Sequence, residues 1–351
     1  MAIFFDAPVD PVDLTEFVRR VPTPSNLGLQ SMFPSTVRDT TKVNFREITK
    51  KNRAARFRAP DGRIHVADRD GATDKVVNML PLSDSRNQGE YETLQLEMAR
   101  LGGTRTEALA NAIYNDAEDL TRYTQNRVEL ALGDVLTDGK FTPNLHDELA
   151  GVEIDFGVPA SHLITLAGNQ TWTAGNAATA DALATLTAAC DQYEVTNGDR
   201  PGWAMTSRSV LRALESQVSL INAVYGAQMG RTSIPMSDLL STFDNRGIPT
   251  DWRTNETKID VDGVNTRVIP EDLVILGPSN PEDLLEFRYG LTATALELVD
   301  SSHVEFGFSQ APGIVGCVVK EGPPLRKFTF VDAIGIPLLK DAKKLMVVKV
   351  R

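Results

Sequence analysis

The sequence has few of the residues that build metal sites or disulfide-linked folds. Its 351 residues include only two cysteines and four histidines, which are Cys190, Cys317, His65, His146, His162 and His303. The cysteines stand far apart with no CxxC pair, which argues against a disulfide framework and against a cysteine-ligated zinc site. No two histidines form an HxxxH or HExxH pair, so we expect surface or hydrogen-bonded histidines and no metal site.

Long apolar runs and glycine-rich phosphate loops are also missing. No stretch approaches about 18 uninterrupted apolar residues, so we expect no transmembrane helix and no membrane partner. The first residues, MAIFFDAPVDPVD, do not place positive charge before an apolar core, so we expect no secretory signal. The GxxxxGK and GxGxxG patterns of nucleotide sites are absent, and we expect no bound cofactor.

Basic residues are outnumbered. The chain has 47 acidic and 36 basic residues and a formal charge of −11. Such a balance repels nucleic acid on average, whereas a sequence-reading DNA-binding protein normally has the opposite sign. A hydrophobic content of 42% and the length allow one large domain or two to three modest ones, with a core that needs no disulfides.

Three short patterns resemble catalytic or calcium sites, and we interpret each as structural. Asp300-Ser301-Ser302-His303 contains the letters of a triad but no nucleophile elbow. Asp68-Arg69-Asp70-Gly71 and Asp260-Val261-Asp262-Gly263 lack the glycine at position six and the glutamate at position twelve of a calcium loop, and they are better read as hairpin turns. We therefore expect no catalytic, cofactor-binding or metal-ligating residue.

The N-terminal quarter of the chain predicts projecting elements. Residues 1–40 contain five prolines, which make a long regular element improbable and favour an extended arm lying on a neighbour, with a short helix near 13–20. Residues 41–88 alternate in polarity and contain two turn signals, which predicts a long β-hairpin. The hairpin has too little apolar content to form its own core, so we expect it to pack on another subunit.

The predicted hairpin also concentrates positive charge. We predict intersubunit contacts for Lys50, Lys51, Arg53, Arg56, Arg58 and Arg63. Two alternatives are contact with packaged DNA and a solvated strand face. The acidic balance of the rest of the chain favours pairing with a neighbouring subunit.

The strongest helical signal runs from about 89 to 138. Apolar residues recur at spacings of three and four, with an interruption at Gly102-Gly103, a capping box at Thr104–Glu107 and an end at Asp138-Gly139. The first part of the stripe is Tyr91, Leu94, Met98 and Leu101, and the second is Leu109, Ile113, Leu120, Val128, Leu132 and Val135. About 30 helical residues make a rod of roughly 45 Å, long enough to serve as a spine.

Helices and strands mix in the remainder. We predict strands and loops over 140–178, helices over 178–194, 207–225 and 236–245, a hairpin at 259–264, and strands at 273–276, 314–319, 328–331 and 345–350. The fold class is α+β, with a spine helix between an extended N-terminal part and a mixed C-terminal part.

Several short stretches, taken in order, resemble the lambda-type (family E) tailed-phage major capsid proteins, which have the Hong Kong 97-type capsid fold. The stretches that carry the resemblance are Glu92–Met98, Gln125–Ala131, Leu136–Gly139, Val152–Pro159 and Pro312–Gly316. Each is weak alone, but their ordered set is fairly specific and covers about residues 35 to 350.

The resemblance implies an N-terminal arm (1–40), an extended E-loop (41–88), a peripheral domain with the spine helix (89–164), an axial domain (165–310) and C-terminal strands (311–351) that complete the two domains. It also implies a homo-oligomer of pentamers and hexamers in an icosahedral virion shell, working with a portal and non-specifically contacted double-stranded DNA; family members often have a decoration protein as well. Because no long charged pre-segment precedes the arm, we expect a separate scaffolding protein.

The sequence thus predicts a self-assembling major capsid protein of a tailed double-stranded DNA bacteriophage, and no enzyme. One alternative is a non-viral, encapsulin-like nanocompartment shell of the same fold. The other is a hydrolase that uses acidic residues of the axial part.

Overall fold

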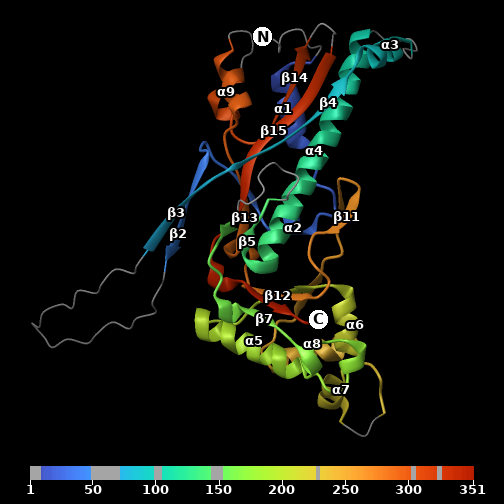
Figure 1. Cartoon of the computed structure of the whole chain (residues 1–351), viewed down its shortest axis with the longest axis vertical. Coiled ribbons are helices and arrows are strands. Elements are labelled where there is room, and N and C mark those ends of the chain that lie inside the picture. Colours follow the sequence, from blue (N-terminus) through green and yellow to red (C-terminus); the bar gives the residue numbers. More distant parts are fainter. Residues whose placement is uncertain are drawn as a thin grey trace, which may run out of the picture.

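The fold is that of a computed structural model, which describes residues 9–48, 72–98, 105–143, 153–226, 230–301, 306–321 and 326–351. The chain forms an elongated body with a β-sheet at each end (Figure 1). A long helix runs beside the first sheet, and a cluster of shorter helices covers the second (Figure 1).

The first sheet is built around one long strand. β15 (Arg326–Leu339) pairs along one edge with β4 (Leu80–Gln88) and along the other with β14 (Val315–Glu321) and then β13 (Leu285–Tyr289). β1 (Ser35–Val37) adds a parallel edge strand beside β13. A 14-residue strand with alternating burial gives the sheet one face for the helices to cover.

The predicted spine helix is confirmed. α4 (Arg105–Asp138) is 34 residues long, or roughly 50 Å at the α-helical rise. Its predicted stripe is buried at all six positions, Leu109, Ile113, Leu120, Val128, Leu132 and Val135. Gly139 ends the helix at φ +76°, where a Cβ would lie 2.1 Å from the Val158 side chain, so only glycine fits this end.

A second, shorter helix precedes the spine. α3 spans Glu90–Met98, and the predicted Gly102-Gly103 interruption and the residue Thr104 lie outside the described residues. The described part of α4 begins at Arg105.

The second sheet has the strand order β7–β16–β12–β8–β9. These strands span Leu163–Thr165, Met346–Lys349, Leu273–Gly277, Trp203–Thr206 and Asp251–Thr254. Every residue of β12 and β8 is buried, because helices and the spine end cover both faces. The helices α5 (Ala182–Asn197) and α8 (Met236–Asn245) confirm two predicted helices to within four residues.

The predicted helix over 207–225 is wrong in its continuity. The segment forms α6 (Arg208–Glu215) and α7 (Val218–Tyr225), with an extended Gln217 (ψ 124°) between them. The carbonyl of Glu215 accepts the Ile234 N–H at 2.9 Å, so a loop residue takes the place of the next turn's amide and the helix stops.

The remaining elements are short. They are α1 (Pro11–Arg20), α2 (Gly28–Met32), α9 (Ala293–Asp300) and the two-stranded pairs β2 (Lys42–Ile48) with β3 (Ala72–Asn78), β5 (Lys140–Phe141) with β6 (Ile154–Asp155), and β10 (Lys258–Val261) with β11 (Val264–Arg267). The predicted helix near 13–20 and the predicted hairpin at 259–264 are confirmed.

The N-terminal strap, defined as residues 9–37, lies on its own chain. Leu14 and Val18 of α1 are buried against α4 and β14, and the Arg19 guanidinium donates to three carbonyl oxygens, those of Gln310, Pro312 and Ile314, at 2.7–2.9 Å. The expectation of an arm on a neighbouring subunit is therefore wrong for these residues. The reason is that their apolar side chains are buried between the spine helix and the first sheet.

Candidate assembly surfaces

The β2–β3 hairpin leaves the body of the molecule. Its strands pair antiparallel over seven residues each and join no other strand among the described residues. Its base is fixed to the body, where Val43 and Met79 are buried. Val76, further out, is 61% exposed. A two-stranded ribbon is marginal in water without further packing, so this hairpin needs a partner surface.

The predicted hairpin over residues 41–88 differs from the observed one at its C-terminal end. β4, which was expected to belong to it, turns away after Met79 and pairs with β15 across nine residues. The structure therefore supports a hairpin from Lys42 to Asn78, and β4 belongs to the first sheet.

The six predicted contact residues, Lys50, Lys51, Arg53, Arg56, Arg58 and Arg63, lie outside the described residues, as does the predicted turn at Asp68–Gly71. Their intersubunit role stays a prediction.

A second, shorter hairpin projects from the other side of the spine. β10 and β11 are joined by a two-residue turn with Asp262 at φ 53° and Gly263 at φ 82°. The Asp260 carboxylate accepts the Gly263 N–H at 2.7 Å. This is the geometry of a tight hairpin turn, which confirms the structural reading of the Asp260–Gly263 pattern over a calcium loop.

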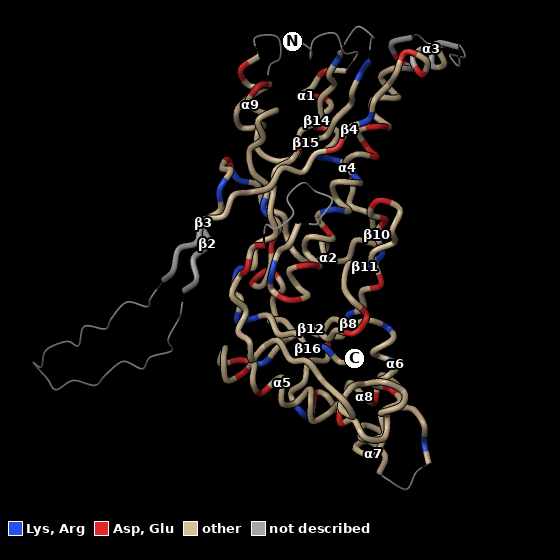
Figure 2. Tube along the Cα trace, viewed as in Figure 1, with Lys and Arg blue, Asp and Glu red and all other residues tan. Residues whose placement is uncertain are grey.

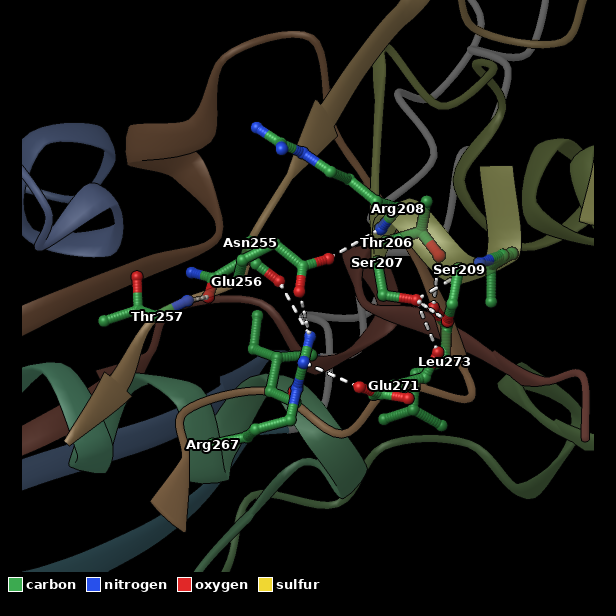
Figure 3. A network of polar contacts seen from close by, with 12 residues as sticks. Thr206, Ser207, Arg208, Ser209, Asn255, Glu256, Thr257, Arg267, Glu271 and Leu273 are labelled. Atoms are coloured by element: carbon green, nitrogen blue, oxygen red, sulfur yellow. Dashed lines mark hydrogen bonds and ion pairs between the residues drawn. The ribbon is translucent and has the colours of Figure 1, made fainter. Parts of the chain in front are cut away.

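A polar network fixes this second hairpin at its base (Figure 3). Arg267 donates to the Glu256 carboxylate at 2.9 Å and to the Glu271 carboxylate at 2.8 Å. The backbone N–H of Arg208, the first residue of α6, donates to the other Glu256 oxygen at 2.7 Å. Although burial alone raises the pKa of Glu256, these contacts hold it below its ordinary value. The network joins the hairpin to the second sheet.

The same base lies against the spine helix. A Cβ at Gly133 of α4 would lie 2.4 Å from the Val268 carbonyl oxygen, so the chain after β11 touches the helix backbone. Sequence reasoning did not identify this junction. An isolated glycine inside the periodic pattern of α4 was the available signal.

Two apolar residues of α3 are exposed. Tyr91 is 73% exposed and Leu94 is 59% exposed, although both belong to the periodic stripe that predicted the helix. Acidic residues flank them at Glu90 and Glu92. The stripe pattern predicts a helix correctly in α3 and α4, but it predicts burial within one chain only in α4.

The described histidine forms structural contacts. His162 is buried, its ring nitrogens lie 3.0 Å from the Leu345 carbonyl oxygen and the Thr196 hydroxyl, and burial lowers its pKa. This confirms the expectation of a hydrogen-bonded histidine at that position; the other three lie outside the described ranges. Within those ranges, no group of three or more His, Cys, Asp or Glu could hold a metal ion, and no helix is long and apolar enough to cross a membrane.

The comparison with protein families decides the identity of the fold and its role. The family model of phage major capsid protein E matches residues 10–298. This range contains the spine, both hairpins, four of the five strands of the second sheet, and β1, β4 and β13 of the first. The chain belongs to this capsid protein family. It is a phage major capsid protein, and its place is the virion capsid.

Solved structures agree with this family in fold. A prophage protein of E. coli CFT073, assigned as a capsid protein, is 16% identical with a TM-score of 0.63, over 98% of this chain and 99% of that one. A phage-related protein of Bordetella bronchiseptica RB50 is 13% identical with a TM-score of 0.54, over 99% and 98%. The predicted α+β, Hong Kong 97-type capsid fold is thereby confirmed. A sequence search of curated proteins finds no match.

Proposed function

We propose that this capsid protein assembles through its projecting elements into pentamers and hexamers of an icosahedral head that encloses double-stranded DNA. The observation that carries the proposal is the β2–β3 hairpin, which leaves the body and pairs with no further strand among the described residues. Contacts that are individually modest and repeated by symmetry give a closed shell large collective stability.

The proposal also assigns a role to each segment of the chain. Residues 41–88 act as the E-loop up to the point where β4 begins, 89–164 and 311–351 contribute the peripheral part around the spine, and 165–310 form the axial part at the centre of each capsomer. Residues 1–40 act as an arm whose described portion is folded back. The subunit works with a scaffolding protein, a portal and a decoration protein, meets DNA through non-specific contacts, and has no catalytic turnover.

The phage reading is preferred to a non-viral nanocompartment because the matching family is one of phage capsid proteins. For the hydrolase, no described residue cluster supplies a supporting observation, so the acidic residues are assigned to structure.

Electron microscopy of the chain expressed with its scaffolding protein tests the proposal. We expect closed shells or capsomers, and shells purified from infected cells should contain DNA and no enzyme cargo. A chain that stays a monomer at high concentration would contradict assembly.

A variant isolates the hairpin. Replacing residues 49–71 by a short Asn-Gly turn leaves β2 and β3 joined and should preserve a folded monomer while abolishing shells. A second variant, with the charge reversals Arg53→Glu and Arg56→Glu, keeps the hairpin length unchanged. It should lower particle yield. Normal yield from the charge-reversed chain would refute the pairing role of these two residues.

A further inference from the structure

Three arginines gather on one side of α6, and we call them the arginine patch. Arg208 and Arg212 are exposed and stand four residues apart, so their side chains share one face of the helix. The Arg351 guanidinium donates to the carbonyl oxygen and the hydroxyl of Ser209 at 2.9 and 3.3 Å. Since Ser209 lies three residues before Arg212, this contact brings Arg351 beside the same face. Basic positions are visible along the chain near α6 (Figure 2).

Arginines elsewhere in the described part of the chain are held by carboxylates. Arg20, Arg122 and Arg253, for example, each form an ion pair at 2.6–2.8 Å. No side-chain carboxylate of the described residues lies within ion-pair distance of the arginine patch. The patch therefore carries unneutralised positive charge on a chain whose formal charge is −11.

The carboxylates in the surroundings of the patch are engaged or distant. Glu256 accepts from Arg267 and from the backbone N–H of Arg208, and the Arg208 side chain points away from this network (Figure 3). Glu215, the last residue of α6, stands roughly 10 Å along the helix axis from Arg208. Arg351 donates to uncharged acceptors, those of Ser209 and the Trp172 carbonyl oxygen.

The composition of this face indicates which kind of anion it fits. The apolar residues Val210 and Leu214 of α6 are buried, and its exposed side carries arginine and hydroxyl groups. A protein partner normally finds an apolar centre with charges at the rim. Arginine and serine without such a centre are typical of contacts with nucleic-acid phosphates, and the planar guanidinium can donate two parallel N–H groups to one phosphate.

We infer that the arginine patch contacts the phosphate backbone of the packaged double-stranded DNA, which places this face of α6 on the inner surface of the shell. The inference rests on the proposed function, because it requires a shell filled with DNA. A flat helix face that enters no groove reads no sequence. Three phosphate contacts correspond to a slope of about −2.7 when the logarithm of the binding constant is plotted against that of the salt concentration. The contact is therefore weak and sensitive to salt.

Arginine modification by phenylglyoxal, read by mass spectrometry, tests the inference on wild-type heads. DNA-filled heads are compared with heads of the same preparation after they have been emptied of DNA. We expect Arg208, Arg212 and Arg351 to lose most of their modification in filled heads and to regain it in emptied ones. The ion-paired Arg20 and Arg122 are the controls and should react to the same extent in both.

Each other outcome of this comparison has a defined meaning. Protection of the patch in filled and emptied heads alike means that another protein surface covers it, and reactivity in both means that it faces solvent. Either result overturns the inference while the proposed function stands, as does equal loss of modification at the control arginines. A wild-type chain that forms no DNA-filled heads overturns the proposed function, and the inference with it.

Charge-matched variants give an independent measurement. Binding of the unassembled chain to a short random-sequence DNA duplex is followed by fluorescence anisotropy at increasing salt. The variant with Arg208→Gln, Arg212→Gln and Arg351→Gln should bind with a salt slope smaller by about 2.7 than that of the control with Arg20→Gln, Arg122→Gln and Arg253→Gln, which loses the same charge. Arginine-to-lysine changes at the three patch positions should keep most of the slope. Equal slopes for the two glutamine variants overturn the inference.

Discussion

The N-terminal strap and the β2–β3 hairpin were predicted as the same kind of element, and they behave differently. Both lie near the N-terminus, were predicted to be extended and were expected to pack on another subunit. The strap buries Leu14, Leu29 and Phe33 within its own chain. The hairpin buries Val43 at its base and leaves Val76 in solvent.

This difference shows which property of an extended segment decides whether it packs on its own chain or stays available to a neighbouring one. Each buried Leu or Phe contributes about 1.5–3 kcal/mol, so a strap with several of them offsets the entropy of ordering itself on the body. The connection between the hairpin strands, residues 49–71, is basic and sparsely apolar in sequence, so it offers little apolar surface for burial. Apolar side chains hold a segment to its own chain, whereas uncompensated charge leaves it available to a neighbour.

The largest effect should come from a side chain that anchors the strap. Phe33 is buried beside Trp203, with ring centroids 6.4 Å apart. Phe33→Ala should lower the free energy of unfolding of the unassembled chain by about 3–5 kcal/mol, because it leaves a cavity in the main core. Val76→Ala on the hairpin should change it by less than about 0.5 kcal/mol. Urea titration of both variants measures the two changes in the free energy of unfolding. Equal changes would contradict the predicted difference between strap and hairpin.

A buried carboxylate fixes the same strap and should give the next largest effect. Glu129 of α4 accepts the N–H groups of Leu29 and Gln30 at 2.8 and 3.0 Å. Burial raises its pKa, and these hydrogen bonds oppose the rise. Glu129→Ala leaves two amides without an acceptor in the core and should cost about 2–3 kcal/mol.

The control for this anchor is Glu16→Ala, which removes an exposed ion pair with Arg20. Surface pairs of this kind contribute little, so the control should change stability by less than about 1 kcal/mol. Hydrogen exchange at residues 28–33 should accelerate only in Glu129→Ala. Unchanged exchange there would show that the carboxylate does not hold the strap.

The β10–β11 hairpin extends the comparison, because it projects and is nevertheless fixed at its base. Gly133→Ala should destabilise the chain by about 1–3 kcal/mol, since the new Cβ would lie 2.4 Å from the Val268 carbonyl oxygen. Helix propensity alone predicts the opposite sign, a gain of roughly 1 kcal/mol. Gly28→Ala, which meets no atom within 4 Å, is the matched control and should be nearly neutral. Thermal unfolding of the two variants shows whether Gly133→Ala destabilises or stabilises the chain.

Periodicity predicted the elements better than it predicted their partners. The spine stripe, the Asp138-Gly139 end and the Asp262-Gly263 turn are local patterns, and each was found as predicted. Contacts between distant segments were missed, because no local pattern encodes that Glu215 bonds to Ile234 or that Arg19 reaches the loop before β14.

The candidate site was predictable only in part. The basic cluster of the hairpin connection is visible in the sequence as a departure from an acidic average. The β10–β11 hairpin required the structure, because only the fold places its turn beside the spine and shows which carboxylates Arg267 contacts at its base.

The last prediction concerns pH dependence, in a segment held by a titrating group. The Asp134 carboxylate of α4 accepts the Thr142 N–H at 2.7 Å just after β5, and burial, with the nearby Asp138 charge, raises its pKa to about 6. A folded-state pKa above the ordinary 3.8 means that the protonated form is favoured by folding. The group's stabilising contribution is therefore complete below about pH 4 and is lost as the pH rises through about 6.

Asp134→Asn keeps an oxygen for the Thr142 N–H and removes the titration. The variant should match the wild type below about pH 4 and gain stability relative to it between pH 4 and 6, with a constant difference above, as measured by urea unfolding across this range. Asp138→Asn removes a like charge and should move the wild-type transition to lower pH. A difference between Asp134→Asn and the wild type that does not vary with pH would show that the carboxylate is ionised throughout, and that this part of the chain, like the strap, is held by packing and backbone hydrogen bonds alone.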